Sequence, residues 1–133
     1  MKKYTGRCQC GYIKFTLTGE PNDPHLCYCH MCQRLSGAPV VAWVNFPLSS
    51  LTYEGAKPAL YRSSKKTQRG FCPKCGSSLF ALDDGDKYIC MTVTTLDDKN
   101  SIVPKFESFK ESSPPWMCIP DVKKRLRKEK KQS

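Results

Sequence analysis

The sequence has no long apolar run, and this absence excludes one class of protein at once. A helix that crosses a bilayer needs about 20 consecutive apolar residues, and no stretch of the chain approaches that length. The first residues, MKKYTGRCQCG, contain two lysines but no apolar segment after them, so we expect no signal peptide. We therefore expect a cytoplasmic protein without a membrane partner, in a compartment where thiols stay reduced.

Hydrophobic residues are also few, at 39% of 133 residues. This length predicts one domain with a modest core, which a structural metal ion would supplement. Cysteine, in contrast, is abundant, with nine residues. Nine is an odd number, so a complete set of intramolecular disulfides is impossible, and the clustered spacing suits metal binding better.

The formal net charge of +10 lies mostly at one end of the chain. The last 13 residues, DVKKRLRKEKKQS, hold seven basic and two acidic side chains. We expect a domain over residues 4–121 and a basic, frayed or disordered tail over 122–133. The tail fits a nucleic-acid or other acidic partner, but it has no aromatic residue to stack on bases, which favours a solvated end.

The pattern along the chain predicts a mainly β fold built of antiparallel strands. Residues 12–17 alternate apolar and polar side chains, and residues 38–46 and 87–96 are rich in β-branched and aromatic residues. A loop is expected at 19–25, a helical turn before Gly37, a hairpin-like stretch at 51–61, and a last short strand at 103–106. We expect both tryptophans, Trp43 and Trp116, in the core.

Four cysteines form a candidate structural metal site. CPKCG at 72–76 is the strongest local signal, because a C-x-x-C-G turn directs two thiolates at one ion. The alternative, a redox pair, needs a βαβ setting that this β-rich stretch does not supply. CQCG at 8–11 is weak alone, but it supplies the two missing ligands. Cys8, Cys10, Cys72 and Cys75 together predict a closed zinc site.

Three further cysteines, Cys27, Cys29 and Cys32, lie within six positions in LCYCHMCQRLSG. Cys90, Cys118, His25 or His30 would have to supply a fourth ligand, and we favour none of them. The preferred interpretation is a zinc ion held by three thiolates with one open position, which is the pattern of catalytic sites. Such a soft site favours a substrate thiol that reacts with a small electrophile. A second structural site, completed by an unidentified residue, is the alternative.

These segments resemble the glutathione-dependent formaldehyde-activating enzymes, which share a domain with centromere protein V. The resemblance covers roughly residues 4–121 and rests on GRCQCGYIKF, CYCHMCQRLSGA, RGFCPKCGSSLF, VTTLDD and PPWMCIPD. It implies a zinc-stapled β-tent, in which Cys8, Cys10, Cys72 and Cys75 are structural and Cys27, Cys29 and Cys32 are catalytic. It also implies a carbon–sulfur lyase that adds glutathione to formaldehyde and forms S-hydroxymethylglutathione.

Two positions depart from the pattern of this family. Many members have C-H-C where this chain has Cys27-Tyr28-Cys29, and many have a histidine where this chain has Pro104 and Lys105. The cysteines that would hold metal are unaffected, but these changes bear on the identity of the substrate.

Polar residues near the cysteines are candidates for substrate binding. Arg69 abuts the CPKCG turn and could pair with a carboxylate of glutathione. Ser36 and Gly37 could offer a hydroxyl and a backbone N–H to a developing oxyanion. The sequence therefore supports two hypotheses: a zinc-dependent lyase acting on a glutathione adduct, or a non-catalytic zinc module whose tail contacts an acidic partner. The open three-cysteine site favours the enzyme.

Overall fold

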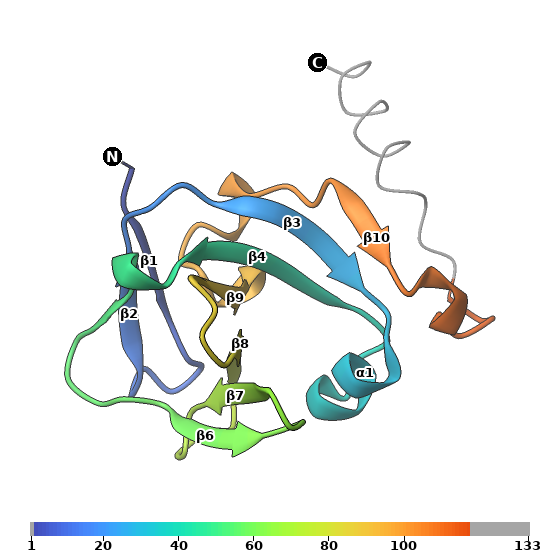
Figure 1. The fold of residues 1–133 in the computed structure, drawn as a ribbon, viewed down its shortest axis with the longest axis horizontal. Coiled ribbons are helices and arrows are strands. Elements are labelled where there is room, and N and C mark those ends of the chain that lie inside the picture. Colours follow the sequence, from blue (N-terminus) through green and yellow to red (C-terminus); the bar gives the residue numbers. More distant parts are fainter. Residues whose placement is uncertain (1, 118–133) are drawn as a thin grey trace.

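A computed structural model describes residues 2–117, and these residues form a mainly β domain (Figure 1). The strands are β1 (Tyr4–Arg7), β2 (Lys14–Leu17), β3 (Asn22–Cys27), β4 (Val41–Pro47), β5 (Thr52–Tyr53), β6 (Ala59–Arg62), β7 (Thr67–Phe71), β8 (Ser78–Asp83), β9 (Tyr88–Thr92) and β10 (Phe106–Ser108). The helical elements are α1 (His30–Ser36) and the short 3₁₀ turns η1 (Leu48–Ser50), η2 (Val93–Thr95), η3 (Lys99–Ser101) and η4 (Lys110–Ser112).

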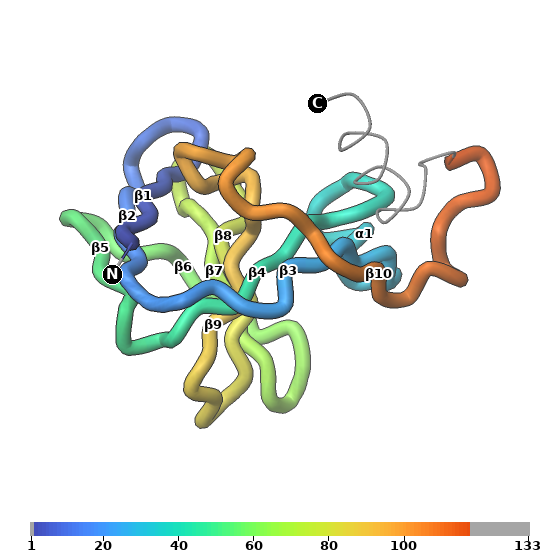
Figure 2. Tube along the Cα trace, turned by 90° about the horizontal axis from the view of Figure 1, so that it is seen from above, coloured from blue at the N-terminus to red at the C-terminus, as the bar shows by residue number. Residues whose placement is uncertain are grey.

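The strands form two sheets. The larger sheet has the order β10-β3-β4-β9-β8-β7-β6, and the smaller one has the order β1-β2-β5. All pairs are antiparallel except β10 with β3, which run parallel. Figures 1 and 2 show the smaller sheet at one end of the molecule and α1 at the other. The antiparallel, mainly β class expected from the sequence is confirmed.

The core lies between the two sheets and follows the predicted alternation. In the segment from 12 to 17, Ile13, Phe15 and Leu17 are fully buried, whereas Lys14 is exposed. These side chains pack with residues of β4, β8 and β9 in one cluster. Gly6 permits β1 to lie close to β2 and η2, because a Cβ at this position would overlap the Phe15 ring and the Thr95 carbonyl.

Three strand boundaries differ from the sequence expectation. The expected loop at 19–25 is wrong, since β3 occupies most of its second half. Asp23 and Pro24 disfavour a regular strand, but the register shifts between Asn22 and His25, and Asp23 takes a left-handed φ of 50°. This irregularity accommodates both residues within the strand.

The strand expected at 87–96 is also shorter than predicted. It ends at Thr92, where the side-chain hydroxyl donates to the carbonyls of Ser78 and Leu79 and the chain turns into η2. The last strand lies at 106–108 rather than at 103–106. Short polar side chains that bond to nearby backbone favour such a turn over a continued strand.

The helical turn before Gly37 is confirmed. Gly37 has a φ of 65°, and its backbone N–H donates to the Gln33 carbonyl, which closes α1 as a left-handed C-cap. Trp43 is buried as expected, but the core position expected for Trp116 is wrong, because this side chain is 72% exposed. Its neighbours Pro114 and Pro115 keep the segment out of regular structure.

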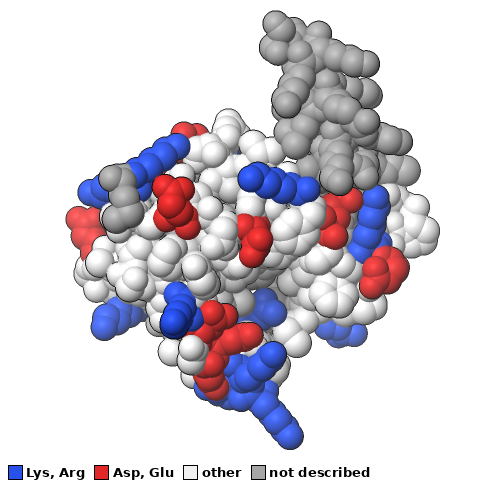
Figure 3. All heavy atoms as spheres, turned by 45° about the horizontal axis from the view of Figure 1, so that its top comes forward, with Lys and Arg blue, Asp and Glu red and all other residues white. Residues whose placement is uncertain are grey.

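Surface charge is mixed on one face of the described domain. Figure 3 shows lysine and arginine side chains interspersed with aspartate and glutamate over the face drawn. The basic tail at 122–133 lies outside the described residues. Within residues 2–117, no helix has the length and apolar character needed to span a membrane.

Candidate functional site

The four cysteines of the predicted structural site meet in space. Their Sγ atoms all lie within 4.8 Å of one another, although the two pairs are more than sixty residues apart. The turn before β2 brings Cys8 and Cys10, and the turn between β7 and β8 brings Cys72 and Cys75. Cys8 and Cys72 are buried, whereas Cys10 and Cys75 face solvent. This group is named the four-cysteine cluster below.

Backbone N–H groups point at these sulfurs. Ile13 N–H donates to Cys8 Sγ at 3.2 Å, and the N–H groups of Lys74 and Cys75 donate to Cys72 Sγ at 3.3 and 3.4 Å. The hydroxyl of Ser77 lies 3.2 Å from Cys75 Sγ, and this contact, followed by the backbone N–H groups of Cys10 and Ser77, lowers the pKa of Cys75 to about 5. Donors that converge on sulfur favour the thiolate, which is the form that binds metal.

The donor set of this cluster fits zinc. Four thiolates at such distances repel one another strongly, so full ionisation requires a cation among them. Soft sulfur ligands in a set of four are typical of structural zinc. The cluster ties residues on both sides of the core, and a bound ion would link the small sheet to the β7–β8 turn.

The second cluster is local in sequence and consists of Cys27, Cys29 and Cys32, named the three-cysteine cluster below. Cys27 ends β3, Cys29 is the N-cap of α1, and Cys32 lies in the first turn of this helix. The Cys32 N–H donates to Cys29 Sγ at 3.3 Å, and the Sγ atoms of Cys27 and Cys32 are 3.3 Å apart. All three sulfurs lie within 4.8 Å of one another.

The thiols of this cluster differ in acidity because their surroundings differ. Burial opposes ionisation of Cys29, but the backbone N–H of Cys32 and neighbouring donors lower its pKa overall. Burial raises the pKa of Cys32 to about 12, with the adjacent thiols adding to the effect. A cation would be needed to ionise all three thiols together.

No histidine completes this cluster among the described residues. His25 Nδ1 lies 2.7 Å from the Asp23 carbonyl, and its ring stacks on Phe106 with centroids 4.9 Å apart. His30, although next to Cys29, is not part of the group either. Cys90 packs against the cluster from β9 without joining it. Within residues 2–117, the cluster offers three thiol ligands.

A contact not foreseen from the sequence ties this cluster to a strand near the C-terminal end of the described residues. Tyr28, between two of the cysteines, is buried, and its hydroxyl donates to Glu107 Oε1 at 3.0 Å. Its backbone N–H donates to the Ser108 carbonyl at 3.1 Å. Glu107 and Ser108 belong to β10, which pairs with β3 in parallel. No local sequence pattern predicts a hydrogen bond between a tyrosine and a glutamate that lie 79 positions apart.

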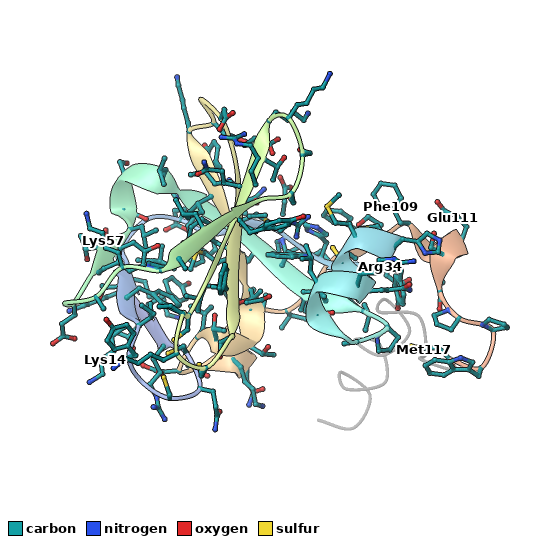
Figure 4. The ribbon with its side chains drawn as sticks, turned by 90° about the horizontal axis from the view of Figure 1, so that it is seen from below. Lys14, Arg34, Lys57, Phe109, Glu111 and Met117 are labelled. Carbon is teal, nitrogen blue, oxygen red and sulfur yellow. The ribbon has the colours of Figure 1, made fainter. Side chains whose placement is uncertain are left out.

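The segment after β10 also packs beside α1. The Gln33 side-chain amide donates to the Ser112 carbonyl at 3.1 Å. Figure 4 shows the segment that carries Phe109 and Glu111 beside this helix, which carries Arg34. The C-terminal part of the described chain therefore supports the helix on which Cys32 lies.

A cavity of about 360 Å³ adjoins the three-cysteine cluster. It lies between α1 and strands β4, β6, β7 and β8, and Cys32 forms part of its wall. Its lining is largely apolar and aromatic: Leu35, Val41, Trp43, Tyr61, Phe71 and Phe80. Its remaining lining residues are Cys32, Ser36, Arg69, Gly70, Gly76 and Ser78.

Arg69 is the one charged residue in this lining. Its guanidinium lies over the Trp43 ring, with Cζ 5.7 Å from the centroid. Nε donates to Ser63 Oγ at 3.2 Å, and Nη2 contacts Met31 Sδ at 3.2 Å. An arginine has five N–H donors, so two contacts fix the group while other donors remain for a ligand in the cavity.

The other polar candidates have local roles. Ser36 Oγ donates to the Cys32 carbonyl at 2.7 Å and accepts from the Ala38 N–H at 3.1 Å. The Gly37 N–H is used by the helix cap. Arg62 on β6, which is not among the lining residues of the cavity, pairs with Asp84 at 3.0 Å. These contacts leave Arg69 as the candidate that lines the cavity and has N–H groups beyond those used in its two contacts.

The comparison with protein families agrees with this arrangement. Residues 3–112 match the family described as glutathione-dependent formaldehyde-activating enzyme. The chain belongs to this family. The match spans both cysteine clusters, the cavity and β10.

One sequence relative and one solved structure of similar fold extend the comparison. An uncharacterised lyase of Schizosaccharomyces pombe is 29% identical over 80 residues, which are 60% of this chain and 58% of the relative. The aligned region thus spans little more than half of the relative's length. A crystal structure of a Rhodobacter sphaeroides protein is similar in fold, with a TM-score of 0.61 and 23% identity, over 78% of this chain and 99% of that one.

Proposed function

We propose that this protein is a zinc-dependent carbon–sulfur lyase that joins glutathione to formaldehyde and forms S-hydroxymethylglutathione. The observation that carries the proposal is the three-cysteine cluster beside a cavity: three sulfurs lie within 4.8 Å, and Cys32 and Arg69 line the same cavity. The family match supports a reaction of glutathione with formaldehyde.

The two clusters would have different tasks. Cys8, Cys10, Cys72 and Cys75 would hold a structural zinc ion, because they fill all four positions of a tetrahedral site. Cys27, Cys29 and Cys32 would hold a second ion with three ligands. A zinc ion there would supply an open coordination position and favour the deprotonated form of a substrate thiol.

The residues of the chain would orient the substrate. The Arg69 guanidinium, fixed by Trp43 and Ser63, would pair with a carboxylate of glutathione through paired hydrogen bonds. Tyr28 and β10 would hold the loop of Cys27 and Cys29 in place. The apolar walls of the cavity would exclude water around the reacting sulfur.

The reaction itself needs no redox step. The sulfur lone pair forms the new bond to the carbonyl carbon of formaldehyde, and the π electrons of the carbonyl move to its oxygen. This oxygen gains a proton, and the thiol has lost one, so the sum is the addition of a thiol to an aldehyde. The reverse reaction breaks the same carbon–sulfur bond.

The non-catalytic alternative depends on the basic tail, which lies outside the described residues. The described face in Figure 3 has charges of both signs, and this mixture does not favour nucleic acid over other partners.

A cytoplasmic location, where thiols stay reduced, suits both the clusters and the substrate. We therefore place the protein there as part of the same proposal.

The decisive experiment measures exchange between free and bound formaldehyde. Zinc-loaded protein is added to glutathione and ¹³C-formaldehyde, and exchange NMR reports the rate at which S-hydroxymethylglutathione forms and dissociates. We expect the rate to rise with enzyme concentration. A rate that is unchanged by the protein at any concentration would refute the proposal.

Two variants give this experiment a matched control. Cys32→Ser should abolish the acceleration, because it removes a ligand of the three-cysteine cluster. Cys90→Ala changes a neighbouring cysteine that packs against the cluster without belonging to it, and should retain the acceleration. Equal loss in both variants would point to general damage rather than to the cluster.

A further inference from the structure

The lining of the cavity differs from what glutathione and formaldehyde alone would require. Glutathione carries two carboxylates and one ammonium group at neutral pH, and each needs a polar partner when it is buried. The cavity lining offers one cation, Arg69, and no acidic residue. One carboxylate of the peptide therefore finds a partner at the cavity, and the other charged groups are better placed in solvent.

The rest of the cavity is suited to an apolar group. Trp43, Tyr61 and Phe71 line it from strands of the larger sheet, and Leu35 lines it from α1. Cavities of about 300–1,000 Å³ hold organic ligands of drug size, whereas formaldehyde has only two heavy atoms. An apolar wall contributes affinity only when it covers apolar surface of a ligand.

Tyr61 and Arg69 lie where the apolar group of a ligand would adjoin its carboxylate. Tyr61 on β6 pairs directly with Arg69 on β7, so both side chains project from the same face of the sheet. Both line the cavity, and Tyr61 is 53% exposed, which places its ring at the mouth. Leu60, the preceding residue of β6, projects from the other face and does not line the cavity.

We infer that the preferred substrates are adducts of glutathione with aldehydes that carry an apolar alkyl or aryl group, and that this group occupies the cavity between Trp43, Leu35 and Tyr61. The inference rests on the proposed function, because it assumes that the adduct sulfur lies at the three-cysteine cluster. Formaldehyde would then be the smallest member of the accepted class.

The chemistry is the same addition with a larger aldehyde. The thiol sulfur bonds to the aldehyde carbon, the carbonyl π electrons move to oxygen, and this oxygen gains a proton while the thiol loses one. The product is a hemithioacetal, and no oxidant or reductant takes part. The apolar group is bound to the reacting carbon and therefore enters the cavity next to Cys32.

Stable thioethers test this inference without turnover. S-methylglutathione and S-hexylglutathione have the same peptide and differ by five methylene groups. Titration calorimetry with zinc-loaded, full-length protein gives the affinity of each. We expect S-hexylglutathione to bind at least about tenfold more tightly, because each buried methylene adds affinity. Tyr61→Ala should reduce this ratio at least about threefold, whereas Leu60→Ala, a matched exposed change on the same strand, should keep it.

Each outcome decides a separate point. Equal affinities for the two thioethers would overturn the inference, even if the NMR experiment shows formation of S-hydroxymethylglutathione. A high affinity ratio that Tyr61→Ala leaves unchanged would also overturn the inference, because the hexyl group would then lie outside this cavity. If neither thioether binds and no exchange is catalysed, the proposed function fails and the inference fails with it.

Discussion

Tyr28 and Glu107 are hydrogen-bonded across 79 positions of the chain, with the phenol donating to Oε1 at 3.0 Å. The Tyr28 side chain is buried, and the Glu107 side chain is only 9% exposed and also pairs with Lys110 at 3.2 Å. Burial, followed by the nearby carboxylate, raises the pKa of Tyr28 to about 12. The phenol therefore stays protonated and donates its hydrogen bond at physiological pH.

Tyr28→Phe should lower the free energy of unfolding by about 1.5–3 kcal/mol, because a hydrogen bond to a charged acceptor is lost and the carboxylate stays largely buried. Urea denaturation of wild type and variant measures this difference. Tyr12→Phe, at an exposed tyrosine stacked under Lys74, is the matched control and should change stability by less than about 0.5 kcal/mol.

The pH dependence of this difference has a defined sign. The folded pKa of Tyr28 lies above the ordinary value of 10.0, so its contribution is fully present below pH 10 and is lost as pH rises toward 12. The stability difference between wild type and Tyr28→Phe should therefore be the same at pH 7 and pH 9. A difference that disappears by pH 9 would show that the phenol ionises in the folded state.

Cys75→Ser and Cys32→Ser should have opposite effects on fold and function. The four-cysteine cluster joins residues 62 positions apart or more, and structural zinc contributes about 10–16 kcal/mol in small peptides. A domain is stable by about 5–15 kcal/mol, so Cys75→Ser should unfold much of the chain. Cys32→Ser affects one local segment and should leave the circular dichroism spectrum close to that of wild type.

Elemental analysis of the same variants distinguishes the two clusters. Wild type should hold between one and two zinc ions per chain, and Cys32→Ser should hold one. If Cys32→Ser unfolds while Cys75→Ser stays folded, the assignment of structural and reactive clusters is reversed. Iron in place of zinc, with strong visible absorbance, would contradict the identity of the metal.

The sequence predicts much of this arrangement because its informative features are local. CPKCG and the alternation at Ile13, Phe15 and Leu17 each specify a turn or a buried face within a few residues. Zinc-type spacing also predicted which cysteines group together, since a C-x-x-C turn needs two more ligands. The short helix before Gly37 followed from one glycine at a left-handed position.

The missed features depend on tertiary contacts. Strand β3 contains Asp23 and Pro24, which locally favour a loop, but pairing with β4 and β10 on either side imposes a strand with a bulge. Trp116 is apolar, yet the described fold leaves it no partner surface and it stays exposed. The Tyr28–Glu107 bond forms only once β10 lies beside β3. The cavity forms only once α1 lies beside β4, β6, β7 and β8. No local sequence pattern predicts either arrangement.

Removal of metal should change the reactivity of the cysteines in a defined order. In the metal-loaded protein, iodoacetamide should modify the ligand thiols slowly, and a strong chelator should make them reactive. Cys90 should stay unmodified under native conditions, because burial raises its pKa to about 12 and the thiolate is the reactive form. Peptide mass spectrometry after timed alkylation measures each site. Early modification of Cys90 in folded protein would contradict its packed position on β9.

Substitution of Arg69 should weaken glutathione binding without unfolding the protein. Arg69→Ala removes the one cation of the cavity, and loss of hydrogen bonds to a charged group costs about 1.5–3 kcal/mol, or roughly tenfold to a hundredfold in affinity. Arg69→Lys keeps the charge but loses the planar fork and the stacking on Trp43, so it should recover only part of the loss. Arg62→Ala is the matched control, because it breaks an exposed pair with Asp84 that contributes little. Calorimetric titration with glutathione measures all three variants, and unchanged affinity in Arg69→Ala would remove this residue from the binding site.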